Sequence, residues 1–153
     1  MTFVVEKDPG VIPTILTEML DNCVSGITLA DPDEPDMPLV YVNSVFERMT
    51  GYSGDEVVGR NCRFLQGDAT DQPEIDTLRQ AIARRESVTV TLRNYRRDGS
   101  LFHNRLSLTP LTDPRGVLVY YMGVQYDVTE QVEAEAENAR LRALLANRDP
   151  GTS

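Results

Sequence analysis

Residues 61–67 of this chain read Asn61-Cys62-Arg63-Phe64-Leu65-Gln66-Gly67. The segment places a thiol between an amide and a guanidinium, and follows them with an apolar pair, a second amide and a glycine. This mixture is poorly suited to a hydrophobic core, because a buried charge and two buried amides would each need a polar partner. The same side chains suit the wall of a pocket whose ligand has an anionic end, polar edges and a reactive face.

Length and composition indicate one globular domain. The 153 residues suit a single domain with a short appendage, and 41% hydrophobic with 25% charged residues is ordinary for a soluble protein. The net charge of -9 argues against nonspecific binding to nucleic acid or to an anionic membrane. The apolar runs are too short to span a bilayer, and the N-terminus lacks the features of a signal peptide. We therefore expect a cytoplasmic protein with neither nucleic acid nor membrane as a partner.

The chain contains two cysteines, Cys23 and Cys62, and one histidine, His103. Their spacing fits no metal site and no Ser-His-Asp arrangement, so we expect neither a bound metal nor an enzyme. Cys23 is expected to be a small buried apolar residue. A disulfide between the two cysteines is not expected in the cytoplasm.

The apolar pattern and the turn residues predict the order of the elements. Helices are expected at 11–21, in two short pieces near 44–50 and 53–58, at 72–85 and at about 127–147. Their starts are assigned to the capping boxes Ser44/Glu47, Ser53/Glu56, Asp71/Glu74 and Asp127/Glu130. Strands are expected at 27–30, 39–43, 87–95, 101–111 and 117–127, and residues 149–153 should be frayed. This order predicts an α+β fold with a five-stranded antiparallel sheet.

Three amides stand in phase with the apolar face of the predicted meander. Asn94 follows Val88, Val90 and Leu92 at alternate positions, and Asn104 lies among the apolar residues of the next strand. For both amides to share a face, the connection between the strands must contain an odd number of residues, three or five, with Gly99 left-handed. Gln125 stands in phase on the last strand, two residues after Gly123.

These amides suggest a planar ligand with alternating polar edges. An amide side chain offers both donors and an acceptor, and on a core face it costs a few kcal/mol when it has no partner. Arg63 and Arg79 are candidates for an anionic end, because the planar guanidinium fork suits a phosphate. Arg60, Arg84 and Arg85 are expected to be solvated surface groups.

Together these features resemble the light-oxygen-voltage (LOV) domains of the PAS superfamily, and among them the bacterial short LOV photoreceptors. The resemblance covers residues 26–127, and rests on Tyr41-Val42-Asn43, Met49-Thr50-Gly51-Tyr52, residues 59–67, Asn94-Tyr95, Asp98-Gly99, Phe102-His103-Asn104 and Gly123-Val124-Gln125. It implies a PAS fold with helices on one face of the sheet. A helical extension at 1–25 would precede the domain, and a C-terminal helix with a frayed tail at 128–153 would follow it.

The resemblance also implies a role for each matched residue. Cys62 would be the photoreactive thiol, and Asn61 and Gln66 would bind the ribityl chain of a flavin. Arg63 and Arg79 would hold its phosphate. Asn94 and Asn104 would bind the pyrimidine edge, and Gln125 the carbonyl and ring nitrogen near the reactive carbon. The expected lining of the ring is Thr28, Asn43, Leu65, Leu78, Leu92, Leu106, Leu108 and Gly123.

The implied function is a blue-light photoreceptor in which Cys62 forms a reversible covalent bond to the flavin carbon C4a. The two arginines imply FMN, with FAD or riboflavin as minor occupants. The signal would leave through the terminal helices to a homodimer contact or to a separate downstream protein. Two alternatives remain at this point: a flavin-binding redox or protein-interaction PAS module in which photochemistry is incidental, and a PAS domain for another ligand. The second alternative would leave the three amides unexplained.

Overall fold

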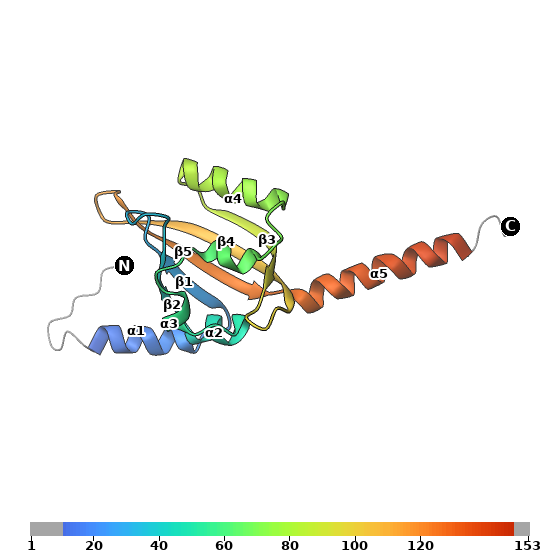
Figure 1. Ribbon diagram of the computed structural model, residues 1–153, viewed down its shortest axis with the longest axis horizontal. Coiled ribbons are helices and arrows are strands. Elements are labelled where there is room, and N and C mark those ends of the chain that lie inside the picture. The colour runs from blue at the N-terminus through green and yellow to red at the C-terminus, as the bar shows by residue number, and fades with distance from the viewer. Residues whose placement is uncertain (1–10, 149–153) are drawn as a thin grey trace.

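The protein is described by a computed structural model for residues 11–148 (Figure 1). Its centre is one antiparallel sheet in the order β2-β1-β5-β4-β3. The strands are β1 (Gly26–Ala30), β2 (Leu39–Val42), β3 (Val88–Tyr95), β4 (Leu101–Thr112) and β5 (Leu118–Asp127). The predicted α+β fold and the five-stranded antiparallel sheet are confirmed. The expected tail at 149–153 and the first ten residues of the N-terminal extension lie outside the described residues.

The meander places the amides on one face, as the alternation predicted. Residues 96–100 connect β3 to β4, and Gly99 adopts a left-handed φ of 86°. In the resulting register Leu92 pairs with Asn104, and Leu106 pairs with Gln125. Paired residues of neighbouring strands point to the same face, so the odd connection brings all three amides to the inner side of the sheet.

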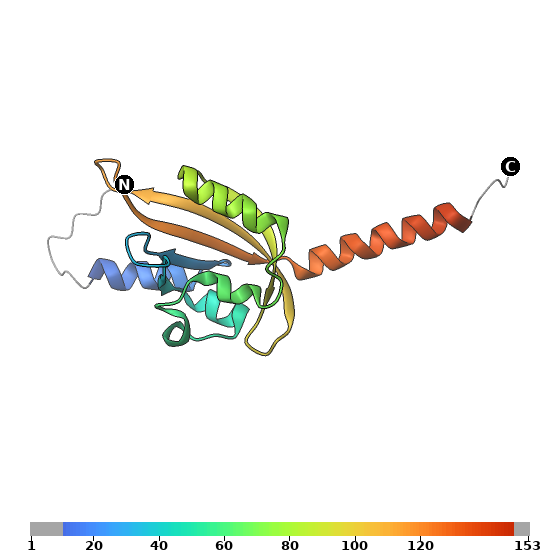
Figure 2. The same ribbon diagram turned by 45° about the horizontal axis from the view of Figure 1, so that its top comes forward.

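The helices lie mainly on that inner side (Figures 1 and 2). They are α1 (Val11–Asp21), α2 (Ser44–Thr50), α3 (Gly54–Val57), the 3₁₀ turn η1 (Cys62–Gln66), α4 (Pro73–Arg84) and α5 (Thr129–Arg148). α2 packs on β1, while η1 and α4 both pack on β3. The final helix α5 projects away from the sheet and buries none of its residues. No helix between Val11 and Arg148 is long and apolar enough to cross a membrane.

Two hydrophobic clusters hold these layers together. The larger contains the buried residues Ala30, Leu39, Phe46, Val57, Leu65 and Tyr121. The smaller joins Ile75 of α4 to Val90 and Leu92 of β3. Burying one such aliphatic or aromatic side chain contributes roughly 1.5–3 kcal/mol, so the two clusters fix η1 and α4 against the sheet.

Only one of the four expected capping boxes is present as predicted. Ser53 and Glu56 form a complete box at α3. At α2 the cap is Asn43, not Ser44, and its carbonyl oxygen accepts hydrogen bonds from the backbone N–H groups of Phe46 at 3.0 Å and Ile27 at 2.8 Å. Asn43 prevails because its amide also donates to the backbone of Leu20 at 2.7 Å, which ties α2 to α1.

The other two helix starts are also corrected. Gln72 is the N-cap residue of α4, and its side chain serves the sheet instead: it accepts from the backbone N–H of Arg93 at 2.7 Å and donates to the carbonyl of Arg93 at 3.0 Å. α5 begins at Thr129, two residues later than expected, and Asp127 accepts a hydrogen bond from the Thr129 N–H at 3.0 Å.

The prediction that Cys23 is buried is wrong. The residue is exposed in the turn between α1 and β1, where its thiol donates to the carbonyl of Met19 at 3.2 Å. The turn lies at the surface, where no second layer is available to cover a small apolar side chain.

Candidate functional site

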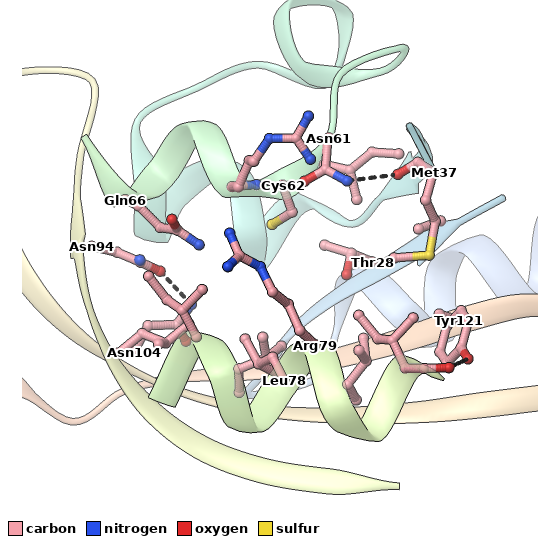
Figure 3. A pocket seen from close by; sticks show the side chains of 18 of the residues that line it. Thr28, Met37, Asn61, Cys62, Gln66, Leu78, Arg79, Asn94, Asn104 and Tyr121 are labelled. Atoms are coloured by element: carbon pink, nitrogen blue, oxygen red, sulfur yellow. Dashed lines mark hydrogen bonds between the residues drawn. The ribbon is translucent and has the colours of Figure 1, made fainter. Parts of the chain in front are cut away.

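A cavity of about 380 Å³ lies between the inner face of the sheet, η1 and α4 (Figure 3). This volume falls within the range of roughly 300–1,000 Å³ typical of small-molecule sites. Its walls are mainly apolar and carry a small number of polar groups from β3, β4 and η1. The predicted residues that line it are Thr28, Asn61, Cys62, Arg63, Gln66, Leu78, Arg79, Leu92, Asn94, Asn104, Leu106 and Leu108.

Cys62 opens η1 and faces this cavity. The side chain of Asn61 caps the turn by accepting a hydrogen bond from the Arg63 N–H at 2.9 Å, and this bond fixes the backbone on both sides of the cysteine. Figure 3 shows the Cys62 sulfur directed into the space among Gln66, Arg79 and Thr28. Burial raises the pKa of the Cys62 thiol to about 12.

The pKa of Cys62 makes the thiol the resting form. An unperturbed thiol has a pKa of about 8.5, so protonated Cys62 favours the folded state below that pH. This contribution is lost as the pH rises from about 8.5 through 12, because the unfolded chain then releases a proton that the folded chain retains. Below pH 8.5 Cys62 is therefore a neutral thiol, which can release its hydrogen and form a bond through its own sulfur.

We predict that Cys62 resists alkylation while Cys23 does not. The thiolate is the reactive form, and at pH 8 a thiol of pKa 12 is ionised in only about one molecule in 10⁴. Iodoacetamide should therefore modify Cys62 at least about 100-fold more slowly than the exposed Cys23. Mass spectrometry of Cys23→Ser and Cys62→Ser, which each retain one cysteine, measures the two rates. Similar rates in the two variants would contradict the buried, protonated thiol.

The three amides form one buried hydrogen-bonded row. Asn104 lies in the middle, and its amide donates to the carbonyl oxygens of Asn94 at 3.0 Å and Gln125 at 2.9 Å. Gln125 in turn donates to the Thr28 hydroxyl at 3.3 Å. The carbonyl oxygen of Asn104 is buried and has no hydrogen-bond partner among the described residues. A buried acceptor of this kind costs about 1–3 kcal/mol, and it fits a ligand that presents an N–H group to β4.

Two arginines lie at the cavity, one on η1 and one on α4. Arg63 pairs with the carboxylate of Asp36, and Arg79 lies 3.7 Å from that of Asp76. Figure 3 shows Arg79 extending from α4 toward η1. Both side chains are more than half exposed. The amides can bind the polar edge of a ring, and the two arginines can bind an anion. Together these side chains fit a phosphorylated flavin.

Four predicted residues do not line the cavity: Asn43, Leu65, Gly123 and Gln125. Asn43 is used as the cap of α2, and Leu65 is buried in the larger core cluster. Gly123 on β5 pairs with Thr28 on β1, and a Cβ at this position would stand 2.5 Å from the Thr28 hydroxyl. Gln125 is fully buried and reaches the cavity only through Asn104 and Thr28, which are among its lining residues.

Sequence reasoning missed seven lining residues: Ala30, Asp36, Met37, Leu39, Ile75, Ile82 and Tyr121. Alternation on β5 places Tyr121 on the face of Gly123, and helical spacing places Ile75 and Ile82 together, so these three were accessible from the pattern. Asp36 and Met37 gave no signal. They lie in an acidic loop whose backbone carbonyls accept hydrogen bonds from the distant Asn61 side chain.

Comparisons with known proteins identify the family of this chain. The PAS domain family matches residues 24–130. A blue-light photoreceptor of Listeria monocytogenes is 39% identical over 123 residues, which are 80% of this chain and 48% of that protein. The blue-light-activated histidine kinase 1 of Erythrobacter litoralis is 41% identical over 141 residues, or 92% of this chain and 39% of that protein. The chain thus spans less than half the length of these curated relatives.

One solved structure links the fold to a ligand class. This structure, described as "Flavin Analogue Sheds Light on Light-Oxygen-Voltage Domain Mechanism", matches with a TM-score of 0.69 at 39% identity. The match covers 88% of this chain and 97% of the solved chain. At this identity and coverage, the likeness extends to the elements that carry Cys62 and the row of amides.

Proposed function

Because this chain belongs to the PAS family, and within it to the LOV domains, we propose that it is a blue-light sensor that binds FMN and switches through Cys62. The observation that carries the proposal is the position of one half-buried, protonated thiol on the wall of a cavity that Asn94 and Asn104 also line. A sensor needs a reversible chemical change at one fixed point, and this geometry supplies one.

Cys62 performs the chemical step. A bound flavin supplies a ring that absorbs blue light and, once excited, accepts a thiol at carbon C4a. Cys62 would supply the sulfur for that bond and give up the hydrogen of its S–H group, which a ring nitrogen would accept. Return of that hydrogen to the Cys62 sulfur, with loss of the bond to carbon, would restore the thiol, so the cycle would need no outside oxidant or reductant. The turn capped by Asn61 would hold the Cys62 sulfur in place while the bond forms and while it breaks.

The remaining polar residues hold and orient the ligand. Asn94 and Asn104 are assigned to the pyrimidine edge, where the unpaired carbonyl of Asn104 accepts a ring N–H. Gln66 is assigned to the ribityl chain. The side chain of Asn61 is already engaged at both ends, so its expected contact with that chain requires the hydrogen bonds to Asp36 and Met37 to be shared. Arg63 and Arg79 are assigned to the phosphate, which favours FMN over riboflavin.

An absorption spectrum of the purified protein tests this function. The proposal requires a bound flavin whose visible absorption bleaches under blue light and recovers in darkness, with FMN as the main flavin released on denaturation. A bound flavin that does not bleach would favour a redox or interaction module instead. A protein that takes up no flavin at all would overturn the proposal.

The signal is proposed to leave through Gln125. A hydrogen gained by the ring nitrogen turns an acceptor into a donor, and an amide can answer by exchanging its two ends. Gln125 bonds Asn104 and Thr28, and β5 runs from it through Asp127 into α5. One exchanged hydrogen bond is worth on the order of 1 kcal/mol, which is enough to shift a balanced equilibrium of α5.

We predict that Gln125→Leu retains bleaching but loses the response of α5. Leucine fills a similar volume and cannot exchange hydrogen bonds, so the change at the ring no longer reaches β5. Hydrogen exchange of residues 128–148, measured in darkness and under light, gives the readout. Tyr126→Leu is the matched control, because Tyr126 is the next residue on β5 and is exposed on the other face. An undiminished difference between light and dark in Gln125→Leu would rule out this route.

The output is proposed to be a protein contact. α5 presents Leu141, Leu144 and Leu145 to solvent, and a second copy of the chain in a homodimer would cover them. A downstream protein is the other proposed recipient, and no catalytic activity is proposed for the chain itself. A reducing compartment keeps the two thiols free, so the cytoplasm is the proposed location.

A further inference from the structure

The turn at Asp36 and Met37 has an unusual backbone. Both residues adopt a left-handed conformation, with φ of 68° and 46°, although neither is a glycine. Such a conformation is unfavourable for side chains with a Cβ and persists only where surrounding contacts hold it. Both residues also line the cavity. Whatever fixes this turn therefore fixes part of the cavity wall.

Besides the local hydrogen bond from the Met37 N–H to the Glu34 carbonyl, the turn is held by the two residues that flank Cys62. The Asn61 amide donates to the carbonyl oxygens of Asp36 at 2.7 Å and Met37 at 3.3 Å. The Arg63 guanidinium pairs with the Asp36 carboxylate. Among residues 11–148, Asp36 is the one ion-pair partner recorded for Arg63. The turn is thus closed against the segment that carries the thiol.

The ion pair with Asp36 engages the Arg63 guanidinium, which is one of the groups assigned to the ligand phosphate. Arg63 is one of the two cavity arginines assigned to the phosphate, and its partner Asp36 is itself an anion on the cavity wall. A phosphate placed on Arg63 would lie beside the Asp36 carboxylate, and like charges at short range repel. The phosphate and the carboxylate therefore compete for one guanidinium.

We propose that Asp36 is a stand-in anion for the cofactor phosphate, which displaces it from Arg63 and releases the Asp36–Met37 turn. This inference rests on the proposed function. A phosphorylated flavin opens the contact, whereas riboflavin leaves it closed. Asp36 is accordingly a positioning residue that lowers the affinity for FMN and couples the shape of the cavity wall to the phosphate.

Affinities for two flavins test the proposal. The Kd values of FMN and riboflavin are measured by quenching of flavin fluorescence at one ionic strength, for the wild type and for Asp36→Asn. Asparagine keeps the shape of the side chain and removes its charge. FMN should bind about two- to five-fold more tightly to Asp36→Asn, the range expected for loss of competition from an exposed ion pair, while the riboflavin Kd should not change.

Two further variants separate the ion pair from general charge. Asp33→Asn removes the same charge from the same loop, and no ion pair of Asp33 with an arginine is recorded in the described chain. It should change the FMN Kd less than Asp36→Asn does. In an Arg63→Gln background, Asp36→Asn should have no effect on FMN. The proposal would be overturned, in favour of a long-range charge effect, if Asp33→Asn raised the FMN affinity as much as Asp36→Asn does. An equal gain from Asp36→Asn in the Arg63→Gln background would overturn it as well.

The outcomes also distinguish this inference from the function on which it rests. If the wild type binds neither flavin, the proposed function fails. If the wild type binds both flavins, only the stand-in role fails when Asp36→Asn leaves the FMN Kd unchanged, raises it, or changes the FMN and riboflavin Kd values equally. Hydrogen exchange on the wild type gives a check without a variant. The Met37 N–H, which donates to the carbonyl of Glu34 at 3.1 Å, should exchange faster with FMN than with riboflavin, and equal rates would contradict the release of the turn.

Discussion

Replacing Cys62 with alanine should abolish light-induced bleaching completely while leaving the flavin bound. The alanine side chain has no atom that can form a bond to the ring, and the polar contacts assigned to the ligand come from other residues. The excited flavin then loses its energy by emission, so the variant should be strongly fluorescent. Absorption and emission spectra before and after blue light give both readouts.

Cys23→Ala is the matched control for this variant. It removes the only other cysteine of the chain, which is exposed between α1 and β1 and is not among the cavity-lining residues. This control should bleach and recover as the wild type does. Bleaching that survives in Cys62→Ala would mean that another group reacts with the ring, and the assignment of the thiol would be wrong.

The second large effect is expected from Asn104→Leu. Leucine has a similar size but no donor, so the carbonyl oxygens of Asn94 and Gln125 both lose the hydrogen bond that Asn104 supplies. Leaving two buried acceptors unpaired should lower the free energy of unfolding of the flavin-free protein by about 2–4 kcal/mol. The ligand also loses the acceptor for its N–H, so the flavin Kd should rise at least about tenfold.

Urea unfolding and flavin titration measure the two consequences separately. His103→Leu is the control, because His103 precedes Asn104 on β4 and its side chain points to the opposite face of the sheet. That variant should retain stability and flavin affinity to within about 0.5 kcal/mol. If Asn104→Leu behaves like His103→Leu, the row of amides has no part in holding the ligand.

The parts of the site that follow from alternation were predictable from the sequence. Strand side chains alternate strictly, so the phases of Asn94, Asn104 and Gln125 were fixed once the strands were recognised. The odd connection at 96–100 then followed from the need for one shared face, and the structure confirms it. A local rule with a period of two leaves little room for tertiary contacts to change the outcome.

The parts that depend on distant contacts were not predictable. The pattern Ser44-x-x-Glu47 fits a capping box, yet Asn43 takes the cap because α1 offers it a second set of partners. Gln125 has the right phase, but Thr28 and Asn104 stand between it and the cavity. The contacts of the turn at Asp36 with Asn61 and Arg63 have no local sequence signal, because those residues are 25 and 27 positions further along the chain.

The isolation of α5 sets a limit on what a partner can sense. Its 20 residues bury no side chain, so α5 lacks the tertiary packing that supplies most helical stability in proteins. Its start is held: the Thr129 hydroxyl accepts from the His103 N–H at 2.9 Å, and Arg96 binds Asp127 at 2.5 Å. Because helix formation is cooperative from a nucleus, a change at this start alters the fraction of time the later turns are helical. Under the proposed function, the signal would be a change in the helical fraction of residues Thr129 to Arg148, graded along the helix, and a partner packed on the distal turns would convert that gradient into a single transition.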